Sequence, residues 1–547
     1  MNIRAGRLKS LYDKLSRSSS SRVLAFVILF AGAGLMALFF ARAASPSASV
    51  EAESGATTGG VSRLASSLAS GGSYIKFNDN SSSILGIAKI IGKTEDGKAK
   101  LFFNPEANPA NVSKYELLRD GTKVAELAGA QIVNARVGSL TGVSAHLEVI
   151  NSSPAQIASS TRSLDEIAAD GYSYTRIDFY WSGSTEPSDQ NFNWTTIDSS
   201  VDRAHARGLK VIAMPTYSPH WTRADTRTTD KTPPDDLNQY VQFAEAAVRR
   251  YGSNSTITKY RNNPVLHWEL WNEPNLRCFW QDPSNQKPEW INTSGGCLNP
   301  LGYGPSVGKY TELLELTYPR MKLADPNAFV MVGGLAVPID ISPRDFVAGI
   351  YYVHFATPEY ASKPVPFDGV AVHVYSSGSH PLTYQSWNAF VQVDDIRRVM
   401  ESISPAEGQK PIWGTEASYS TVCSTGYKVC DIAEPTDDGK QPQATLLTEA
   451  IYNWHLYKNV GPYNIYLYKD LESGTAGSTD GYYGLVKSDF TPKLSKAVLK
   501  EVNKQIIIAD DAPVTGQSYS YQIRAIMQDG SQVTGPSANY TSIDFRQ

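Results

Sequence analysis

The chain has 547 residues, a formal net charge of -4 and only 19% charged residues. It is too long for one ordinary domain, but long enough for a full eight-stranded barrel with smaller modules. Outside the amino terminus the sequence has no long basic stripe, which argues against nucleic acid as a partner.

The amino terminus has the pattern of an export segment. Lys and Arg residues from Arg4 to Arg22 precede the apolar run Val23 to Phe40, and Ala41-Arg42-Ala43 follows as a small-residue cleavage site. The run of 18 residues is near the lower limit for a membrane span, so residues 1–43 are predicted to be either a cleaved signal peptide or an uncleaved anchor. Either alternative places the rest of the chain outside the cell, secreted or tethered through residues 23–40.

Residues 44–95 are rich in Ser and Gly and are predicted to form a linker. Within them, Val50 to Glu53 and Ala69 to Ile75 resemble the opening of carbohydrate-binding β-sandwich modules. The remainder of such a module is missing, so the prediction is a truncated segment that does not bind sugar by itself.

Two short β-rich stretches flank the centre of the chain, at residues 96–137 and 506–547. In the first, Tyr115 to Gly121 resembles the middle of a fibronectin type III sandwich, with Asp120-Gly121 as its hairpin turn. In the second, Gly516 to Ala525 resembles the end of the same kind of module. Each stretch has too few strands for a sandwich, but together they make about one. The chain is therefore predicted to insert a large domain into a small sandwich; two unrelated decorations are the alternative.

Between residues 138 and 505, eight apolar runs alternate with amphipathic stretches, the number that a (β/α)8 TIM barrel requires. The predicted strands are 144–150, 174–181, 210–217, 264–271, 328–337, 367–375, 411–416 and 463–469. The predicted helices are 163–168, 194–207, 237–251, 310–323, 343–353, 394–403, 444–457 and 494–502.

Two of these strands end in a glutamate. Strand four ends in Trp271-Asn272-Glu273-Pro274-Asn275, and strand seven ends in Gly414-Thr415-Glu416. Functional groups of such barrels gather at the carboxyl ends of the strands, and strands four and seven face each other across the lumen. Two opposed carboxyl groups suit glycoside hydrolysis, and a separation of roughly 5–5.5 Å would support the retaining double displacement. Glu416 is then predicted to attack the anomeric carbon while Glu273 acts as acid and base. A purely structural role is the alternative for each, and Glu269, four residues deeper, is predicted to be a buried, paired carboxylate.

These motifs resemble retaining glycoside hydrolases of the large (β/α)8 clan whose acid/base follows an Asn on strand four, and most of all glycoside hydrolase family 39. The cues are Trp271 to Asn275, Tyr217 to Trp221 after strand three, and Tyr483 to Val486 before Pro492-Lys493. The resemblance covers about residues 140–505. It implies Glu273 as acid/base, Glu416 as nucleophile, and a hydrogen bond between Asn272 and the sugar 2-hydroxyl near the nucleophile. It also implies that no metal or organic cofactor is needed.

Further residues near the strand ends are candidate substrate-binding or supporting groups. Arg176 on strand two is predicted to donate to Glu416, with a structural ion pair to Asp178 or a neighbour as the alternative. On strand six, Tyr375 is predicted to hydrogen-bond Glu416 and His373 a sugar hydroxyl, with a core histidine as the alternative.

His220 and Trp221 after strand three are predicted to line the floor of the sugar site, and Tyr468 at the end of strand eight to contact substrate; a structural role is the alternative for His220 and Trp221. Strand eight has no tryptophan where many clan members have one. Trp280 and Trp290 are candidates for stacking on outer sugars, or for ordinary loop packing.

The four cysteines follow the export segment, and an even number in an exported chain favours disulfides. The simplest pairing is local, Cys278 with Cys297 and Cys423 with Cys430, and each pair would brace a loop beside the candidate site. Free or zinc-bound thiols are the alternative, although neither pair has the tight spacing of a zinc knuckle.

The leading hypothesis is a secreted or surface-tethered retaining glycosidase whose partner is a β-linked oligo- or polysaccharide. The 58 aromatic residues (30 Tyr, 18 Phe, 10 Trp) are compatible with this, since sugars present flat apolar faces. Two alternatives remain: an endo-acting glycanase of another family of the clan, such as a family 5 endoglucanase, and a non-catalytic glycan-binding or adhesion protein.

Overall fold

The structure is a computed structural model, and it describes residues 61–65, 73–77, 85–145, 153–293, 297–376, 378–424, 428–471 and 481–542. The predicted export segment and much of the Ser/Gly-rich stretch lie outside the described residues. Within those ranges, no helix combines the length and the apolar character that are needed to cross a membrane.

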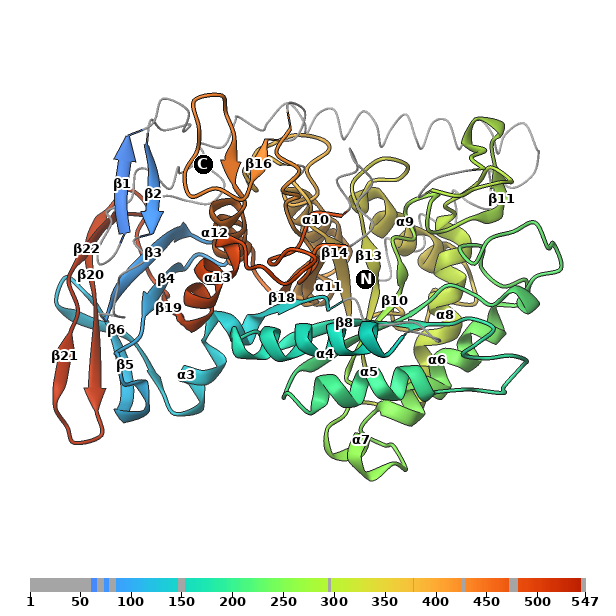
Figure 1. The fold of residues 1–547 in the computed structure, drawn as a ribbon, viewed down its shortest axis with the longest axis horizontal. Helices are drawn as coiled ribbons and strands as arrows, with labels where there is room; N and C mark the ends of the chain where they lie inside the picture. The colour runs from blue at the N-terminus through green and yellow to red at the C-terminus, as the bar shows by residue number, and fades with distance from the viewer. Residues whose placement is uncertain are drawn as a thin grey trace, which may run out of the picture.

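Eight parallel strands close into a barrel, and a helix follows each strand along the chain, which confirms the predicted (β/α)8 architecture (Figure 1). The barrel strands are β7 (Thr141–Val143), β8 (Tyr174–Tyr180), β9 (Lys210–Thr216), β10 (His267–Asn272), β13 (Phe329–Leu335), β14 (Gly369–His373), β15 (Ile412–Glu416) and β18 (Val460–Ile465). The helices that follow them are α4 (Pro154–Ala169), α5 (Thr195–His205), α6 (Leu237–Tyr251), α8 (Val307–Ala324), α9 (Pro343–Ala356), α10 (Gln392–Ile403), α12 (Gln443–Trp454) and α13 (Leu494–Lys504).

The first and last barrel strands lie earlier in the chain than the apolar runs predict. The sequence predicts them at 144–150 and 463–469. In the structure β7 ends at Val143, before the first run begins, and β18 ends at Ile465, within the second run. The barrel closes at Gly142, which pairs with Asn464 on one side and Tyr174 on the other. A Cβ atom at this position would collide with the side chains of both neighbours, so the closing strand requires glycine here.

Two antiparallel sheets lie beside the barrel, and each combines strands from both ends of the chain. The first has the order β19 (Ile506–Asp510), β4 (Ala99–Asn104), β3 (Gly86–Lys93). The second has the order β21 (Gln532–Thr534), β20 (Ser518–Met527), β5 (Val112–Arg119), β6 (Thr122–Ala128), with β22 (Ala538–Thr541) also paired to β20. The chain therefore leaves these sheets to form the barrel and then returns to them.

These sheets share one apolar core, in which Phe103 and Leu117 from before the barrel pack with Ile508 and Ile523 from after it. Strand β3 lies within the stretch predicted as linker, so the prediction of a linker up to residue 95 is wrong for this strand. Lysines and a glycine interrupt its apolar pattern, and only its pairing with β4 makes it recognisable as a strand.

The sheets are attached to the outside of the barrel through α12. The ring of Phe102 on β4 lies 4.6 Å from the ring of Tyr452, and Lys89 on β3 forms an ion pair of 3.1 Å with Glu449. Because Phe102 also belongs to the apolar core of the barrel, the two parts form a continuous packed interface.

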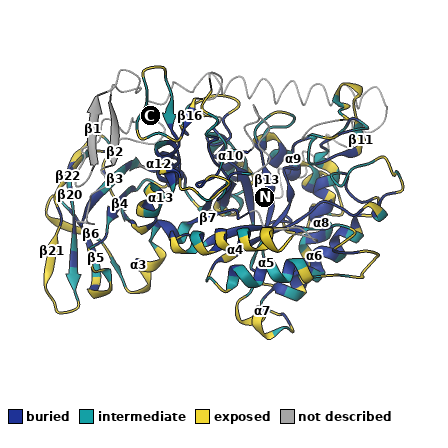
Figure 2. Cartoon of the chain, in the orientation of Figure 1, coloured by how far each residue is buried: buried dark blue, intermediate teal, exposed yellow. Residues whose placement is uncertain are grey.

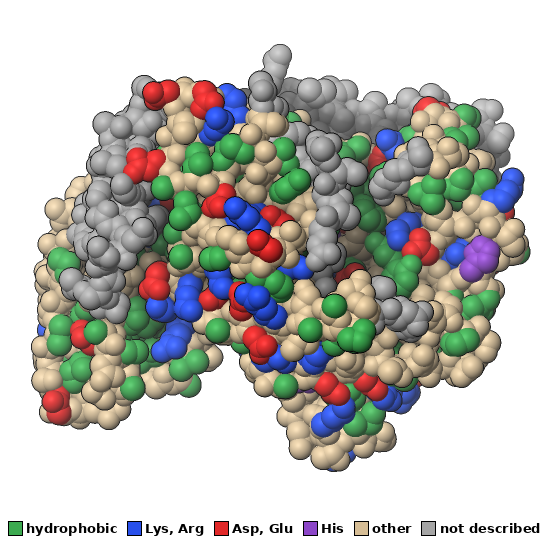
Figure 3. Space-filling view, viewed as in Figure 1, with side chains coloured by type: hydrophobic (Ala, Val, Ile, Leu, Met, Phe, Trp, Pro, Cys, Tyr) green, Lys and Arg blue, Asp and Glu red, His purple; other side chains and the backbone are tan. Residues whose placement is uncertain are grey.

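Burial follows this arrangement, since the barrel strands are buried and the covering helices expose their outer faces (Figure 2). On the face drawn in Figure 3, Lys and Arg side chains alternate with Asp and Glu side chains rather than forming a basic field.

Candidate active site

The candidate site lies at the carboxyl ends of the barrel strands, where Glu273 directly follows β10 and Glu416 ends β15. Trp271 and Glu273 have φ angles of 74° and 45°, in the left-handed region that residues with a side chain rarely adopt. The amide of Glu273 donates to the carbonyl of Gly334 at 3.1 Å, which fixes this turn. Such strain at a strand end is typical of positions where function dictates the direction of a side chain.

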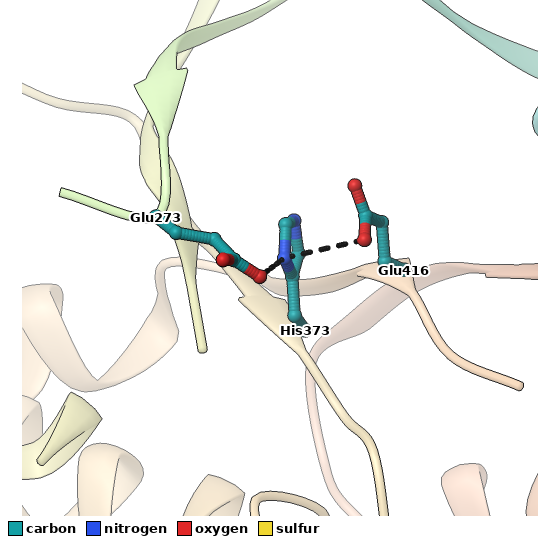
Figure 4. Close-up of side chains that lie close together, drawn as sticks. All are labelled: Glu273, His373 and Glu416. Carbon is teal, nitrogen blue, oxygen red and sulfur yellow. Dashed lines mark hydrogen bonds and ion pairs between the residues drawn. The ribbon is translucent and has the colours of Figure 1, made fainter. Parts of the chain in front are cut away.

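Glu273, His373 and Glu416 converge from three strands, with the imidazole of His373 between the two carboxyl groups (Figure 4). His373 Nδ1 lies 2.7 Å from Glu273 Oε1 and 3.5 Å from Glu416 Oε2. One side-chain oxygen of each glutamate and one ring nitrogen of His373 all lie within 4.8 Å of one another. The two glutamates therefore approach each other closely, and the His373 imidazole lies between them as a shared partner.

Arg176 on β8 connects most of the polar groups under this pair. Its guanidinium lies 2.5 Å from Glu416 Oε1 and makes bonds of 2.7 and 3.0 Å to the two oxygens of Glu269. It also donates to Asn272 Oδ1 at 3.0 Å. The side chain of Arg176 thus donates to Glu416 as predicted, and it also forms an ion pair with a neighbour, Glu269, which was the alternative.

Electrostatics separates the roles of the buried acids. Burial raises the pKa of Glu269, but Arg176 and His373 together outweigh this and lower it to about 2, so Glu269 is an anion at neutral pH. Burial lowers the pKa of His373, but the negative charge of Glu416, the ion pair with Glu269 and the hydrogen bond to Glu273 raise it to about 9. For Glu273, burial and the charge of Glu416 together raise the pKa against the opposing effect of His373. Burial and the charge of Glu416 therefore favour the protonated form of Glu273.

Tyr375 completes the surroundings of Glu416, because its hydroxyl donates to Glu416 Oε2 at 3.0 Å. Its ring lies 5.8 Å from that of Tyr483, which in turn lies 6.0 Å from Tyr466. Tyr466 and Tyr483 are half-buried and form an aromatic wall beside the glutamate pair. Sequence reasoning missed both as site residues, although Tyr483 lies in one of the motifs that carried the family resemblance.

A glycine pair in β13 is a second feature that the sequence analysis missed. A Cβ atom at Gly334 would collide with the ring of His373 and with the carboxylate of Glu269. The amide of Gly334 also donates to Glu269 Oε1 at 2.9 Å. Glycine within a strand is a signal for close approach of another group, and here that group is the His373 ring.

The structure corrects two predicted substrate contacts. His373 is completely buried, and its Nε2 lies 3.7 Å from Glu269, too far for a hydrogen bond, so His373 contacts carboxylates rather than a sugar hydroxyl. Tyr468 is also buried, and its hydroxyl donates to Glu166 of α4 at 2.7 Å. It therefore points to the outer helix α4 rather than into the barrel.

Four other predicted residues lie on loops of the same end of the barrel. His220 is exposed and Trp221 is half-buried, with its indole donating to the carbonyl of Glu186 at 2.6 Å. Trp280 is completely buried against Trp271, at 4.9 Å between ring centroids, so the prediction that it stacks on an outer sugar is wrong. Trp290 is half-buried and lines a surface cavity instead.

Both disulfides form between the cysteines that are close in sequence, Cys278 with Cys297 and Cys423 with Cys430. The first lies in the loop after β10 and the second in the loop after β15. Each disulfide therefore braces one of the two loops that follow the glutamate-bearing strands.

The cluster of Glu273, His373 and Glu416 also has the composition of a metal site. His373 and Arg176 lie beside these carboxylates as positively charged groups, an arrangement that also suits proton transfer.

Comparison with known proteins bears on the chemistry of this site. The family model described as cellulase (glycosyl hydrolase family 5) matches residues 128–416. A β-xylosidase from Geobacillus stearothermophilus is 26% identical over 220 residues, covering 38% of this chain and 36% of that protein. The matched region thus spans about a third of the length of this curated relative.

Solved structures with a similar chain path include two family 39 proteins. The family 39 glycoside hydrolase of Bacteroides cellulosilyticus matches with a TM-score of 0.45 and 16% identity, over 89% of this chain and 96% of that one. The family 39 enzyme of Xanthomonas axonopodis matches with a TM-score of 0.44 and 17% identity, over 71% and 72%. The predicted resemblance to (β/α)8 glycoside hydrolases of this type is confirmed by the comparisons taken together.

Proposed function

Because the chain belongs to the cellulase family (glycosyl hydrolase family 5), we propose that it is a retaining glycoside hydrolase acting on β-linked glycans. The observation that carries the proposal is the approach of Glu273 and Glu416 from β10 and β15 to within 4.8 Å, oxygen to oxygen. Inverting enzymes hold their carboxyl groups roughly 6.5–9.5 Å apart to admit a water, whereas retaining enzymes hold them at about 5–5.5 Å. The geometry favours the retaining class.

In the first step Glu416 attacks the anomeric carbon, a covalent glycosyl-enzyme bond forms, and the bond to the leaving oxygen breaks. Glu273 gives its proton to that oxygen, which leaves as a neutral hydroxyl. Burial supports this assignment, because it raises the pKa of Glu273 and so favours the protonated form. Glu416 meets two donors, Arg176 and Tyr375, which hold it as an acceptor facing the sugar.

In the second step Glu273, now a carboxylate, removes a proton from water, and the water oxygen displaces Glu416 from the anomeric carbon. His373 is protonated and lies 2.7 Å from Glu273, so it stabilises the carboxylate form that this step needs. We assign His373 as a positioning residue rather than a catalytic one, since it is buried and acts through Glu273. Asn272, aligned by Arg176, is assigned to the sugar 2-hydroxyl.

The flanking sheets and the amino-terminal residues can also be assigned. We propose that the two flanking sheets form one fibronectin type III-like module that hosts the barrel as an insertion, supported by the pairing of β4 with β19 and of β5 with β20. The basic and apolar pattern of residues 1–43 supports export, with the catalytic end outside the cell.

A second candidate, endo-acting cleavage of a cellulase type, is favoured by the description of the matching family model. Product analysis separates cleavage at the chain ends from internal cleavage. Release of single sugars from a polysaccharide indicates action at chain ends, and a rapid fall in viscosity indicates internal cleavage.

The experiment that tests the proposed function measures reducing-sugar release from a panel of aryl β-glycosides and β-linked polysaccharides. Wild type should release sugar, and Glu416→Ala should lose this activity while still binding the same glycan. Equal activity in wild type and Glu416→Ala would remove Glu416 from the mechanism. Binding without turnover by wild type would instead support a glycan-binding protein on a barrel scaffold.

A further inference from the structure

A cavity of about 270 Å³ lies where the flanking sheets meet the last helix of the barrel. One wall is the connection from β4 to β5, and the other is the last turn of α13, with Glu501 and Lys504. Arg136 also lines the cavity, and its backbone forms an antiparallel bridge with Ile506. The cavity therefore borders the place where the chain enters the barrel and returns from it.

This cavity and the candidate active site lie at opposite ends of the barrel. A helix that follows a barrel strand runs from the carboxyl end of the strands back to the amino end, so the last turn of α13 lies at the amino end. Glu273 and Glu416 lie at the carboxyl end. A ligand in the cavity is therefore not a substrate in contact with the two glutamates.

Two charged side chains of the lining have no partner. Glu501 and Lys504 form an ion pair of 2.6 Å with each other. Within the described ranges, neither the Arg136 guanidinium nor the Glu106 carboxylate forms an ion pair or a side-chain hydrogen bond, although both residues are half-buried. The cavity thus presents one unpaired cation and one unpaired anion.

The unpaired cation and the unpaired anion both lie near the hydroxyl group of Tyr115. This hydroxyl accepts a hydrogen bond from the Glu106 amide at 3.2 Å. Burial raises the pKa of Tyr115; the bond from the Glu106 amide lowers it, the charge of Glu106 raises it, and the charge of Arg136 lowers it. Both charges therefore act on one buried atom without forming an ion pair with each other.

The lining favours a ligand that carries both charges. A ligand with only a negative charge would be repelled by the Glu106 carboxylate, and one with only a positive charge by the Arg136 guanidinium. Pro105 and Pro109 supply an apolar part of the wall, and the fixed φ of proline keeps it in one conformation. A small molecule with a carboxylate, an ammonium group and an apolar group matches this lining.

We propose that this cavity binds a free α-amino acid, with the carboxylate of the ligand at Arg136 and its ammonium group at Glu106. The site uses neither Glu273 nor Glu416, so its failure in an experiment leaves the proposed function untouched. A bound amino acid contacts both the β4–β5 connection and α13 and holds the flanking sheets against the barrel. We therefore expect binding to raise the unfolding temperature of the whole chain.

The test is calorimetric titration of the full chain with leucine, N-acetyl-leucine and leucinamide. These three share one side chain, but leucine carries both charges, N-acetyl-leucine only the negative one and leucinamide only the positive one. Leucine should bind with a dissociation constant below about 1 mM, and each derivative at least about ten-fold more weakly. Absence of leucine binding, or equal affinity for leucine and either derivative, would overturn the site.

Two substitutions separate the contributions of the two charges. Arg136→Gln should weaken leucine binding about ten-fold and leave leucinamide bound equally or more tightly, because the repulsion of its ammonium group is removed. Glu106→Gln should weaken leucine binding to a similar degree and leave N-acetyl-leucine bound equally or more tightly. These opposite responses distinguish a charge contact from a general loss of structure.

The matched control is Arg344→Gln, which removes a guanidinium that is paired with Asp345 at 2.8 Å on α9 and should alter none of the affinities. Unchanged leucine affinity in Arg136→Gln or in Glu106→Gln would contradict the assigned contacts. If either variant fails to fold, the series of three ligands on wild type decides the proposal.

Discussion

His373 Nδ1 lies 2.7 Å from Glu273 Oε1, so the proposed acid/base is hydrogen-bonded to a buried, protonated imidazole. The same nitrogen is 3.5 Å from Glu416. The His373 imidazolium thus faces both Glu273 and Glu416. Double displacement requires one of these acids to be protonated and the other to be ionised, and the imidazolium stabilises the ionised form of each. Burial counteracts this effect at Glu273, where the balance raises the pKa.

Loss of the nucleophile should be rescued by a small external anion. Glu416→Gly should lower kcat by about 10⁴-fold or more, because no group remains to form the covalent intermediate. Azide should restore turnover and yield the glycosyl azide of inverted configuration, seen by NMR. Glu407→Gly, on the helix before β15, serves as the control and should need no rescue. An azide product of unchanged configuration would contradict Glu416 as nucleophile.

Loss of the acid/base should depend on the leaving group. Glu273→Gln should lower kcat/KM by about 10²–10⁴-fold for glycosides with an alkyl leaving group, which need a proton. For a dinitrophenyl glycoside the loss should be much smaller, because that leaving group departs as an anion. Steady-state rates over a series of leaving groups measure this. Equal losses throughout the series would assign the proton donor to another residue.

Removal of the histidine cation should change the pH profile. His373 lowers the pKa of Glu273, so His373→Gln should move the alkaline limb of kcat/KM to higher pH. A merely structural role for His373 would lower the rate at every pH without moving the limb. Gly334→Ala, which crowds the His373 ring, should reproduce part of the shift.

The same histidine makes stability depend on pH. Its pKa rises from 6.5 to about 9 on folding, so its contribution is fully present below pH 6.5 and is lost as the pH rises through 9. The contribution is of order 3 kcal/mol for a fully buried group. Denaturant unfolding of wild type and His373→Gln between pH 6 and 10 should therefore converge at high pH. Parallel curves would contradict a charged His373.

The tyrosine beside the nucleophile should have a moderate effect. Tyr375→Phe removes one hydrogen bond to Glu416 and keeps the ring against Tyr483, so kcat/KM should fall about ten-fold with unchanged unfolding temperature. Tyr384→Phe, at an exposed position of the following loop, is the control. An unaltered rate in Tyr375→Phe would mean that this hydrogen bond is not needed for turnover.

Much of this molecule follows from local sequence. Alternating apolar and amphipathic stretches determine a (β/α)8 barrel, because each strand and helix must bury its own apolar face. Glu273 and Glu416 could be selected because each ends an apolar run, and parallel strands bring their carboxyl ends to one side. The local disulfides followed from short spacing in the same way.

Tertiary structure alone decided which groups meet across the barrel. His373 was placed correctly on its strand, but its partner Glu273 lies 100 residues away, and only barrel closure and the space left by Gly334 bring the two together. Tyr468 and Trp280 carry no local sign of the direction in which they point, and the structure turns both into buried packing. The physical reason is that strand and helix patterns are set by neighbours in the chain, whereas hydrogen-bond partners and pKa values are set by groups that only the closed barrel brings within contact distance.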